Sequence, residues 1–507
     1  MKRQVSLVLL SCLLLGACNV GPDYKPPAMA VPPAYQESGS TQLGAPMSRP
    51  QSVSADVSAW WSQLHDRELD HLISVALGSN LDVQTAASRV RQAREQEIIA
   101  GAAEYPSVSA SGVGLNQHSN SNLIGKLTGA PASETDAPAN AKLYSAGFDA
   151  SWELDIFGGT RRAMQAAAAN TESSLWGLRD AEVTLSAEIA TDYLSLRAAQ
   201  ARITLTQNEL NDQQALFNII RARAQAGFVT QLDVNQQRTL LATTQAEIPA
   251  LQAEVAIMAH AIAVLLGQQP ESLANELGAA ATLPSVPTTL PVGLPADLLR
   301  RRPDVREAER QLAAATAQVG VAVAALYPKV DLIGLASFTS NHLSDLLTPA
   351  SFGTIGLAQI SWPIFEAGKI HATIRSDEEQ QIQAYLAYQK SVLSALQDAE
   401  DALARYTTEQ RRWQATDEAA IAAASSVAIA TAQYRSGLIP YINVLTAQTS
   451  SLSTKDQLVQ SQQALATDLA SLFKALGGGW SENYVNPDVR PRIPVEQASQ
   501  PEVPSGQ

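Results

Sequence analysis

The sequence predicts a mainly α-helical chain, built by internal duplication, that also contributes four β-strands to a membrane β-barrel. Landmarks of the first half return in order in the second half: Tyr105-Pro106 as Tyr327-Pro328, and Ala226–Val234 as Ser436–Val444. The offsets between these pairs are 222 and 210 residues. Each half reads as helix, strand, strand, very long helix, helix. A duplicated unit of this kind builds a tube more readily than an active-site cleft.

Composition supports closely packed helices and argues against a nucleic-acid partner. Of the 507 residues, 46% are hydrophobic but only 5% are aromatic, so alanine, leucine and valine supply the apolar surface. Small side chains of this kind let helices approach closely. The formal net charge is −14. Because phosphate binding needs a basic face, this charge excludes nucleic acid as the expected partner.

The N-terminus has the layout of a secretory signal. Lys2 and Arg3 precede a short apolar run, which ends in Leu15-Gly16-Ala17-Cys18. The run is too short to span a bilayer as a mature helix. The small residues before the cysteine resemble a bacterial lipobox, which implies cleavage of residues 1–17 and a covalent lipid on Cys18. The alternative is a plain signal peptide with an incidental cysteine. Asn19 after the cysteine implies, by the same resemblance, export to the outer membrane.

Four segments are expected to be strands. They form the pairs 106–117 with 143–156 and 329–340 with 352–363. In the second segment, apolar residues from Tyr144 to Leu154 alternate with polar ones, which is the period of a strand with two different faces. The length suits a tilted membrane strand of about 9–11 residues. A soluble antiparallel sheet with one wet face is the alternative interpretation.

Two helical hairpins are the most unusual expectation. Between Thr160 and Ala226 there is no proline and one glycine, and between Lys369 and Ser436 there is neither. Helices of that size would extend on the order of 100 Å. Gly227 and Gly437 stand where a left-handed C-cap is expected. Return helices follow, and Pro249 is expected to kink the first of them.

These features divide the chain into consecutive segments. The predicted segments are a signal peptide (1–17), a lipid-anchored extended tether (18–60), a first repeat (61–266, with its hairpin at 160–266), a proline-rich linker (267–302), a second repeat (303–478, with its hairpin at 366–477) and a disordered tail (479–507).

Four strands are too few to close a barrel. A strand edge in hydrocarbon leaves backbone groups unpaired at several kcal/mol each, and small membrane barrels need about eight strands. Several copies of the chain must therefore pool their strands, and the same assembly would bring the hairpins together around a hollow axis. This argument does not fix the number of copies.

Motifs for catalysis or metal binding are not found. The six histidines are scattered without a His-Glu-x-x-His arrangement, and one mature cysteine cannot form a thiolate metal site. No Gly-x-Ser-x-Gly elbow or dinucleotide fingerprint occurs. Acidic runs on long helices are more often solvated faces than acid/base pairs. We therefore expect no enzymatic activity, no metal and no cofactor other than the lipid on Cys18.

Several motifs together resemble a known family. They are Asp56-Val57-Ser58-Ala59-Trp60-Trp61, Leu298–Arg306 followed by Glu309, Tyr327-Pro328, and Ala475-Leu476-Gly477-Gly478-Gly479-Trp480. Across essentially the whole mature chain, the sequence resembles a TolC-like outer-membrane efflux factor of the lipoprotein (NodT) type. The resemblance implies a homotrimer with a shared 12-stranded β-barrel and a periplasmic α-barrel. It also implies docking onto a periplasmic membrane-fusion adaptor coupled to an inner-membrane pump of the resistance-nodulation-division (RND) type. Such a protein is a passive exit duct.

The resemblance also assigns site residues. The adaptor-facing tips of the family match Gly227, Phe228, Val229, Thr230 and Asp233 in the first hairpin, and Gly437, Leu438, Ile439, Pro440 and Asn443 in the second. Plain helix capping is the alternative role for the glycines, Asp233 and Asn443. The periplasmic gate of the family would lie just above the tips. Candidate gate residues are Arg221, Arg223, Thr431 and Arg435, with Thr431 standing where relatives often carry an acidic residue.

Two other classes are compatible with parts of the sequence. A periplasmic adaptor lipoprotein also has long helices, but with one hairpin and lipoyl-like segments. A lipid-anchored enzyme or scaffold with a coiled-coil stalk would not explain matching strand pairs in both halves. The substrate of the efflux system, and the identity of the adaptor and pump, are not encoded in any motif we recognise.

Overall fold

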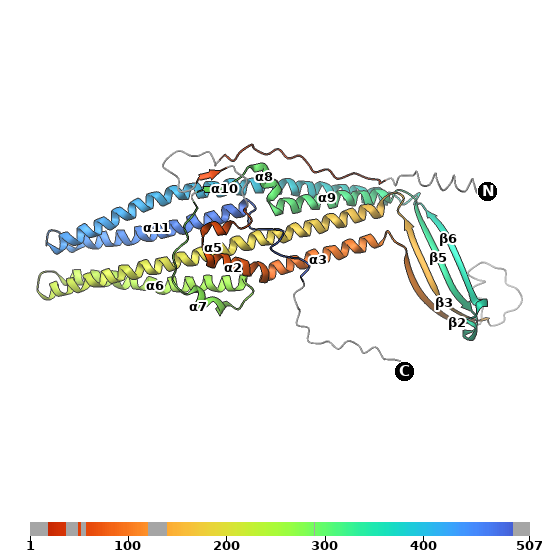
Figure 1. The fold of residues 1–507 in the computed structure, drawn as a ribbon, viewed down its shortest axis with the longest axis horizontal. Helices are drawn as coiled ribbons and strands as arrows, with labels where there is room; N and C mark the ends of the chain where they lie inside the picture. Colours follow the sequence, from red (N-terminus) through yellow and green to blue (C-terminus); the bar gives the residue numbers. More distant parts are fainter. Residues whose placement is uncertain (1–18, 37–48, 52–56, 120–138, 288, 490–507) are drawn as a thin grey trace. The chain divides into compact units, whose positions relative to one another are not determined.

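The computed structural model describes residues 19–36, 49–51, 57–119, 139–287 and 289–489. The predicted signal peptide, Cys18 and the last part of the predicted tail lie outside these residues. The chain falls into two compact units. The strand unit holds the segment up to Pro26 with Ala93–Thr171 and Arg310–Leu386, and the hairpin unit holds the rest. Each is described separately (Figure 1).

The strand unit contains a four-stranded antiparallel sheet in the order β2-β3-β5-β6. Its strands are β2 (Ser107–Ser119), β3 (Ala139–Leu154), β5 (Lys329–Ser340) and β6 (Phe352–Ser361). The predicted start 143 is wrong by four residues, the predicted ends 117, 156 and 363 by two, and the predicted start 106 by one. β3 ends at Leu154 because the Asp155 carboxylate accepts from Arg161 N at 2.9 Å and turns the chain. β6 ends just before Trp362-Pro363, because proline cannot donate to a strand ladder.

The two faces of the sheet differ in chemistry. Ala110, Phe148, Ala336 and Thr354 are consecutive cross-strand partners on the more apolar face. The other face carries polar pairs. Ser109 Oγ donates to Asp149 at 2.6 Å, Ser145 and Thr339 share a hydrogen bond of 3.3 Å, and Lys329 pairs with Glu153 at 3.2 Å. The polar face is interrupted in the second repeat by Ile333, Leu335, Ile355 and Leu357, which explains why alternation is weaker there.

The helices repeat in length as well as order. α3 (Leu81–Ala102) and α9 (Pro303–Ala324), which lead into the strand pairs, both have 22 residues. The long helices α5 (Gly159–Gln225) and α10 (Lys369–Arg435) both have 67, and the return helices α6 (Gln231–Leu265) and α11 (Tyr441–Ala475) both have 35. α6 continues on both sides of Pro249. The duplication is therefore a duplication of backbone geometry.

Three of the motifs that carry the family resemblance lie in the hairpin unit, and the fourth, Tyr327-Pro328, lies in the strand unit, where Tyr327 stacks on Phe157 with ring centroids 4.7 Å apart. Trp60 lies in the short helix η2 (Trp60–Leu64), is 1% exposed and stacks on Phe473 with ring centroids 5.1 Å apart. Gly479 N donates to Val57 O at 3.0 Å, which joins the beginning and the end of the unit. Arg302 binds Asp304 and Asp398 at 2.6 and 3.0 Å. These motifs explain folding and not a binding site.

Two predicted segments are more ordered than expected. The linker 267–302 contains the short helices η3 (Pro270–Leu273), α7 (Ala274–Leu277) and α8 (Pro295–Arg301), and the short strand β4 (Thr289–Pro291). β4 pairs in parallel with β1 (Arg49–Gln51) of the predicted extended tether. The expectation of a disordered tail is wrong for residues 479–489. Trp480 packs edge-on against Trp176 and donates to Arg301 O, and the Arg91 guanidinium binds Pro487 O.

A short helix opens the first repeat. α2 (Arg67–Ser79) has Asp66 as its N-cap, whose side chain accepts from the backbone amides of Glu68 and Leu69. Buried leucine and isoleucine side chains on one face of α2 pack into the hairpin unit. This N-cap and apolar face are what hold α2 in place.

Candidate functional site

The first hairpin turns at Gly227. Its φ is +79°, and no atom lies within 4 Å of where a Cβ would stand. Phe228 N donates to Arg223 O at 2.9 Å, which closes the end of α5. α6 then begins with a capping box, in which the Thr230 hydroxyl accepts from Asp233 N and the Asp233 carboxylate accepts from Thr230 N. Capping is therefore one role of Thr230 and Asp233.

The second hairpin turns in the same way but begins its return helix differently. Gly437 has a φ of +75°, and Leu438 N donates to Gln433 O at 2.9 Å. The N-cap of α11 is Pro440, which makes no side-chain hydrogen bond to the helix. Asn443 N instead donates to the Pro440 carbonyl at 3.2 Å. The expectation that the Asn443 side chain caps this helix is not met.

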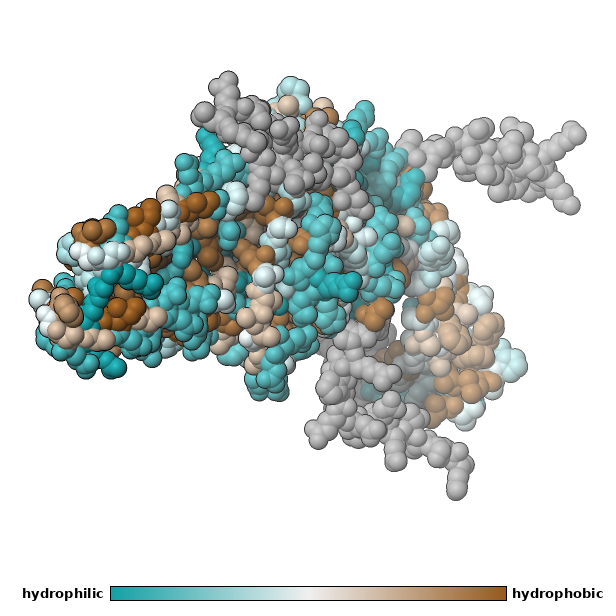
Figure 2. Space-filling view, turned by 60° about the vertical axis from the view of Figure 1, so that its left-hand side comes forward, coloured by the Kyte–Doolittle hydropathy of each residue, from teal (hydrophilic) through white to brown (hydrophobic). Residues whose placement is uncertain are grey.

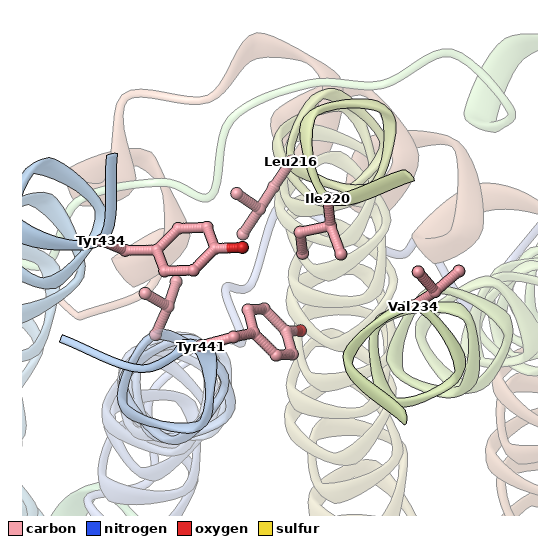
Figure 3. Close-up of a cluster of buried hydrophobic side chains, with 6 residues drawn as sticks. Leu216, Ile220, Val234, Tyr434 and Tyr441 are labelled. Carbon is pink, nitrogen blue, oxygen red and sulfur yellow. The ribbon is translucent and has the colours of Figure 1, made fainter. Parts of the chain in front are cut away.

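A hydrophobic cluster joins the two hairpins just behind the tips (Figure 3). Its buried members are Leu216, Ile220, Val234, Tyr434, Tyr441 and Val444, with Val229 and Ile439 packed against them. The rings of Tyr434 and Tyr441 meet edge to face with centroids 5.9 Å apart. The Tyr441 hydroxyl donates to the Gln237 amide oxygen, and burial raises the pKa of Tyr441 well above its usual value. Tyr441 is therefore a neutral donor in the cluster.

Arg223 adds a polar bond between the same hairpins. Its guanidinium donates to the carbonyls of Tyr434 at 3.1 Å and Arg435 at 2.7 Å, and its Cζ lies 5.0 Å from the Tyr434 ring centroid. Carbonyls at the end of a helix lack intrahelical partners and carry partial negative charge. Arg223 of α5 thus caps the C-terminus of α10.

The side chains of the other candidate gate residues do not take part in this contact, although the Arg435 carbonyl does. Arg221 and Arg435 have exposed side chains, and Thr431 is half-buried on α10. Among the described residues, Arg223 is joined to Tyr434 and to the backbone of Arg435, not to Thr431. Sequence reasoning missed Tyr434, Tyr441 and Gln237. The available signal was that two tyrosines flank Gly437 whereas none flanks Gly227.

Apolar side chains remain uncovered at both turns. Phe228 is 80% exposed and Leu438 is 75% exposed, and Leu232 and Ile442, the second residues of the return helices, are exposed too. These positions correspond under the 210-residue offset. Figure 2 shows hydrophobic residues at the surface of the hairpin ends and, separately, on the strands. Large apolar side chains that are exposed together are typical of contact surfaces.

The part of the chain that the structure describes contains no group of three or more His, Cys, Asp or Glu side chains placed to hold a metal ion. The tips offer helix ends, apolar side chains and one bridging arginine. Their chemistry is that of a contact surface, and the hydroxyl–carboxylate pair of Thr230 with Asp233 belongs to the helix cap.

Comparisons with known proteins agree with this architecture. The model of the outer membrane efflux protein family matches residues 72–268 and 294–478. Nodulation protein T of Rhizobium leguminosarum bv. trifolii is 32% identical over 473 residues, covering 92% of this chain and 96% of the relative. The pyoverdine export outer membrane protein OpmQ of Pseudomonas putida is 33% identical over 489 residues, covering 95% and 98%.

Solved structures show the same fold. The outer-membrane channel OprN matches with a TM-score of 0.83 at 33% identity, covering 91% of this chain and all of its own. The open-state MtrE outer membrane channel of Neisseria gonorrhoeae matches with a TM-score of 0.77 at 26% identity, covering 91% and 98%. The predicted fold class, mainly α with a shared β-barrel portion, is confirmed. The chain belongs to the outer membrane efflux protein family and is the outer-membrane channel of an efflux system.

Proposed function

We propose that three copies of this chain form a homotrimer, in which twelve strands close one β-barrel and the hairpins close a periplasmic α-barrel. The observation that carries this proposal is the open sheet. Within the described residues, β2 and β6 each pair with one neighbour only, so both outer edges have unpaired backbone groups. In hydrocarbon, such edges are costly unless another chain pairs with them.

The chemistry of the sheet sets its orientation in the barrel. The face with Phe148, Trp152 and Phe338 suits lipid, whereas the face with Asp149, Glu153 and Asp331 suits water. A charged side chain on the lipid face near the bilayer midplane costs about 2–4 kcal/mol for Arg or Lys, and less for Asp or Glu. The polar face therefore lines the lumen. A water-filled, acidic passage is compatible with passive movement of small molecules from periplasm to exterior.

The tips dock onto the partner that supplies the cargo. Their exposed apolar residues, Phe228, Leu232, Leu438 and Ile442, fit a periplasmic membrane-fusion adaptor, which in turn couples to an inner-membrane RND-type transporter. The antibiotic efflux pump outer membrane protein ArpC of Pseudomonas putida, 31% identical over 490 residues, supports an efflux partnership of this kind. The protein itself is a passive duct and not an enzyme.

The gate lies just behind these tips. Arg223 joins α5 to the end of α10 and would hold the hairpins in one arrangement. Arg221 lies near it on α5, and Thr431 and Arg435 lie near the end of α10. Movement of one hairpin against the other would have to break the Arg223 bonds. Cys18, with its covalent lipid, would anchor the chain to the outer membrane.

Photo-crosslinking tests the docking surface. A photoreactive amino acid at Leu232 should crosslink to a periplasmic adaptor in the native host, identified by mass spectrometry. Phe228→Asp with Leu438→Asp should remove this crosslink and abolish efflux, because charges replace the apolar contact. Leu347→Asp is the matched control, since Leu347 is 76% exposed but lies between β5 and β6. Unimpaired efflux in the double variant would contradict the docking proposal.

A further inference from the structure

The segment that follows Cys18 is bound to the strand unit by defined hydrogen bonds. Val20 N donates to Phe157 O at 3.2 Å. In return, Arg162 donates from Nε to Val20 O at 3.0 Å and from Nη2 to Gly21 O at 3.2 Å. The same Nη2 pairs with the Asp23 carboxylate at 2.8 Å. The Arg162 side chain is only 3% exposed. A buried guanidinium needs such partners, so the segment and the arginine depend on each other.

Glycines make room for this segment. A Cβ on Gly21 would lie 2.6 Å from Gly320 Cα, and Gly21 also has a φ of +83°. A Cβ on Gly320 would lie 2.8 Å from the Arg162 stem, and one on Gly158 would lie 2.2 Å from the Asn19 side chain. The contacts at Gly21 and Gly158 leave no room for a Cβ beside Asn19–Gly21, and the contact at Gly320 leaves none beside the Arg162 stem.

Aromatic packing extends the contact by three residues. Tyr24 packs against the buried cluster of Ala169, Ala313 and Ala314. The Arg310 Cζ lies 5.5 Å from the centroid of the Tyr24 ring. Small alanines on α5 and α9 leave space for one large ring, and a cation over its face adds attraction. The bound stretch therefore runs from Asn19 to Tyr24.

We infer that Gly158, Arg162 and Gly320 form a binding site, the N-terminal dock, for the peptide Asn19–Tyr24, and that this site fixes where the lipid anchor emerges. Val20 meets Phe157, three residues past Leu154, where β3 ends. A lipid on Cys18 is therefore held at the end of the membrane strands. The placement of the lipid rests on the proposed modification of Cys18, whereas the binding of the peptide does not.

The neighbouring arginine provides a matched control. Arg161 donates from its backbone N and Nε to the Asp155 carboxylate and from Nη2 to Asp155 O. It therefore binds the turn between β3 and α5, whereas Arg162 binds the backbone of Val20 and Gly21. The two residues are adjacent and chemically identical, so a difference between their variants reports the dock itself.

Hydrogen exchange of residues 19–24 in the full-length protein measures the dock. Arg162→Met keeps the aliphatic stem but removes every donor, and should speed exchange of this segment at least about tenfold, because bonds to a charged group are lost. Arg161→Met should leave exchange of the segment within about twofold of the wild-type rate. Arg162→Lys should give an exchange rate between those of Arg162→Met and the wild type, since an ammonium group lacks the planar set of donors with which a guanidinium binds two carbonyls. Equal protection in Arg162→Met and wild type would overturn the inference.

Glycine variants keep the test valid if Arg162→Met does not fold. Gly21→Ala alters only the N-terminal segment and should release it, with exchange again at least about tenfold faster. Gly293→Ala is its control, because Gly293 also has a positive φ, +72°, but nothing lies within 4 Å of its Cβ position. Gly293→Ala should not change exchange of residues 19–24. If Gly21→Ala leaves the segment protected, the close fit is refuted.

Acyl labelling separates the dock from the lipid. Labelling that persists in Arg162→Met, together with fast exchange, supports a dock that acts after modification. If the wild-type chain takes no acyl label at Cys18 while residues 19–24 stay protected, the lipid proposal fails and the dock stands. If the label is present but the segment is unprotected, the dock fails and the lipid proposal stands.

Discussion

The hairpins α5–α6 and α10–α11 share their backbone and differ in how they are held. Their helices have equal lengths, and their turns use Gly227 and Gly437 with nearly the same φ. The side chains at matching positions are different. Thr230 with Asp233 caps α6, whereas Pro440 begins α11 without a side-chain bond. Duplication thus preserved the length of the duct wall, and later substitutions assigned different tasks to the two hairpins.

The same contrast appears deeper in the unit. On α5, Arg179 and Glu182 form a buried ion pair at 2.7 Å. The residue that corresponds to Glu182 on α10 is Val392, which is buried without charge. Near the tips, Tyr434 and Tyr441 of the second hairpin fill the space between the hairpins, whereas Ala224 and Gln231 stand at those positions in the first. At these matching positions the first hairpin has a buried carboxylate and a capped turn, and the second hairpin supplies the aromatic contact.

Replacing the aromatic contact should have the largest effect. Tyr441→Ala should lower the free energy of local opening of the tips by about 3 kcal/mol, because it leaves a cavity and removes the donor to Gln237 Oε1. The matched change in the first hairpin, Gln231→Ala, should cost less than about 0.5 kcal/mol, since Gln231 is exposed. Native-state hydrogen exchange of the turn amides measures both. Equal costs would show that the hairpins are held symmetrically.

The buried carboxylate of the first hairpin should make stability depend on pH. Burial raises the pKa of Glu182 from 4.5 to about 7, although Arg179 opposes the rise. The folded state therefore holds a proton that the unfolded state has lost, so this stabilisation is present below pH 4.5 and is lost as the pH rises through 7. Its size is on the order of 2 kcal/mol. Glu182→Gln should thus raise the melting temperature relative to wild type more at pH 8 than at pH 5.

An exposed carboxylate provides the control for that measurement. Glu418→Gln, on the exposed surface of α10, should shift the melting temperature equally at both pH values. If the melting temperature of Glu182→Gln differs from that of the wild type by the same amount at pH 5 and pH 8, then Glu182 keeps an ordinary pKa in the assembled protein.

The smallest expected effect is a difference in stability between the first turns of α6 and α11. Thr230→Ala removes the capping box and should cost about 1 kcal/mol at the first turn of α6. Pro440→Ala removes no side-chain hydrogen bond and should cost less than about 0.5 kcal/mol. Exchange rates of the first amides of α6 and α11 report both changes. A cost at Pro440 as large as that at Thr230 would mean that proline stiffness matters as much as a cap.

The sequence predicts the repeated elements well because their signals are local. Proline-free runs ending at Gly227 and Gly437, and the alternation from Tyr144 to Leu154, identify hairpins and strands with small errors at their ends. Contacts between distant segments leave no such signal. The dock of Arg162, the pairing of β1 with β4 and the packing of Trp480 depend on residues far apart in sequence.

The positions of the two hairpin turns could be predicted from the sequence, but the side-chain contacts behind them could not, and the adaptor-facing role of the tips stays a prediction. The tips follow from glycine placement and from the family resemblance. The bond from Arg223 to the end of α10 could not be predicted, because its acceptors are backbone carbonyls and every residue has one. The tyrosines that flank Gly437 were visible but ambiguous, since an aromatic residue beside a turn can face solvent or a neighbouring helix. Their burial is decided by the other hairpin.

The central claim is that one chain supplies only part of a pore wall. Native mass spectrometry of the full-length protein, extracted from the outer membrane in mild detergent, tests it most directly. The account predicts a single assembly with three times the mass of the mature acylated chain, which dissociates only when the strands unfold. A stable, folded monomer under the same conditions would contradict it.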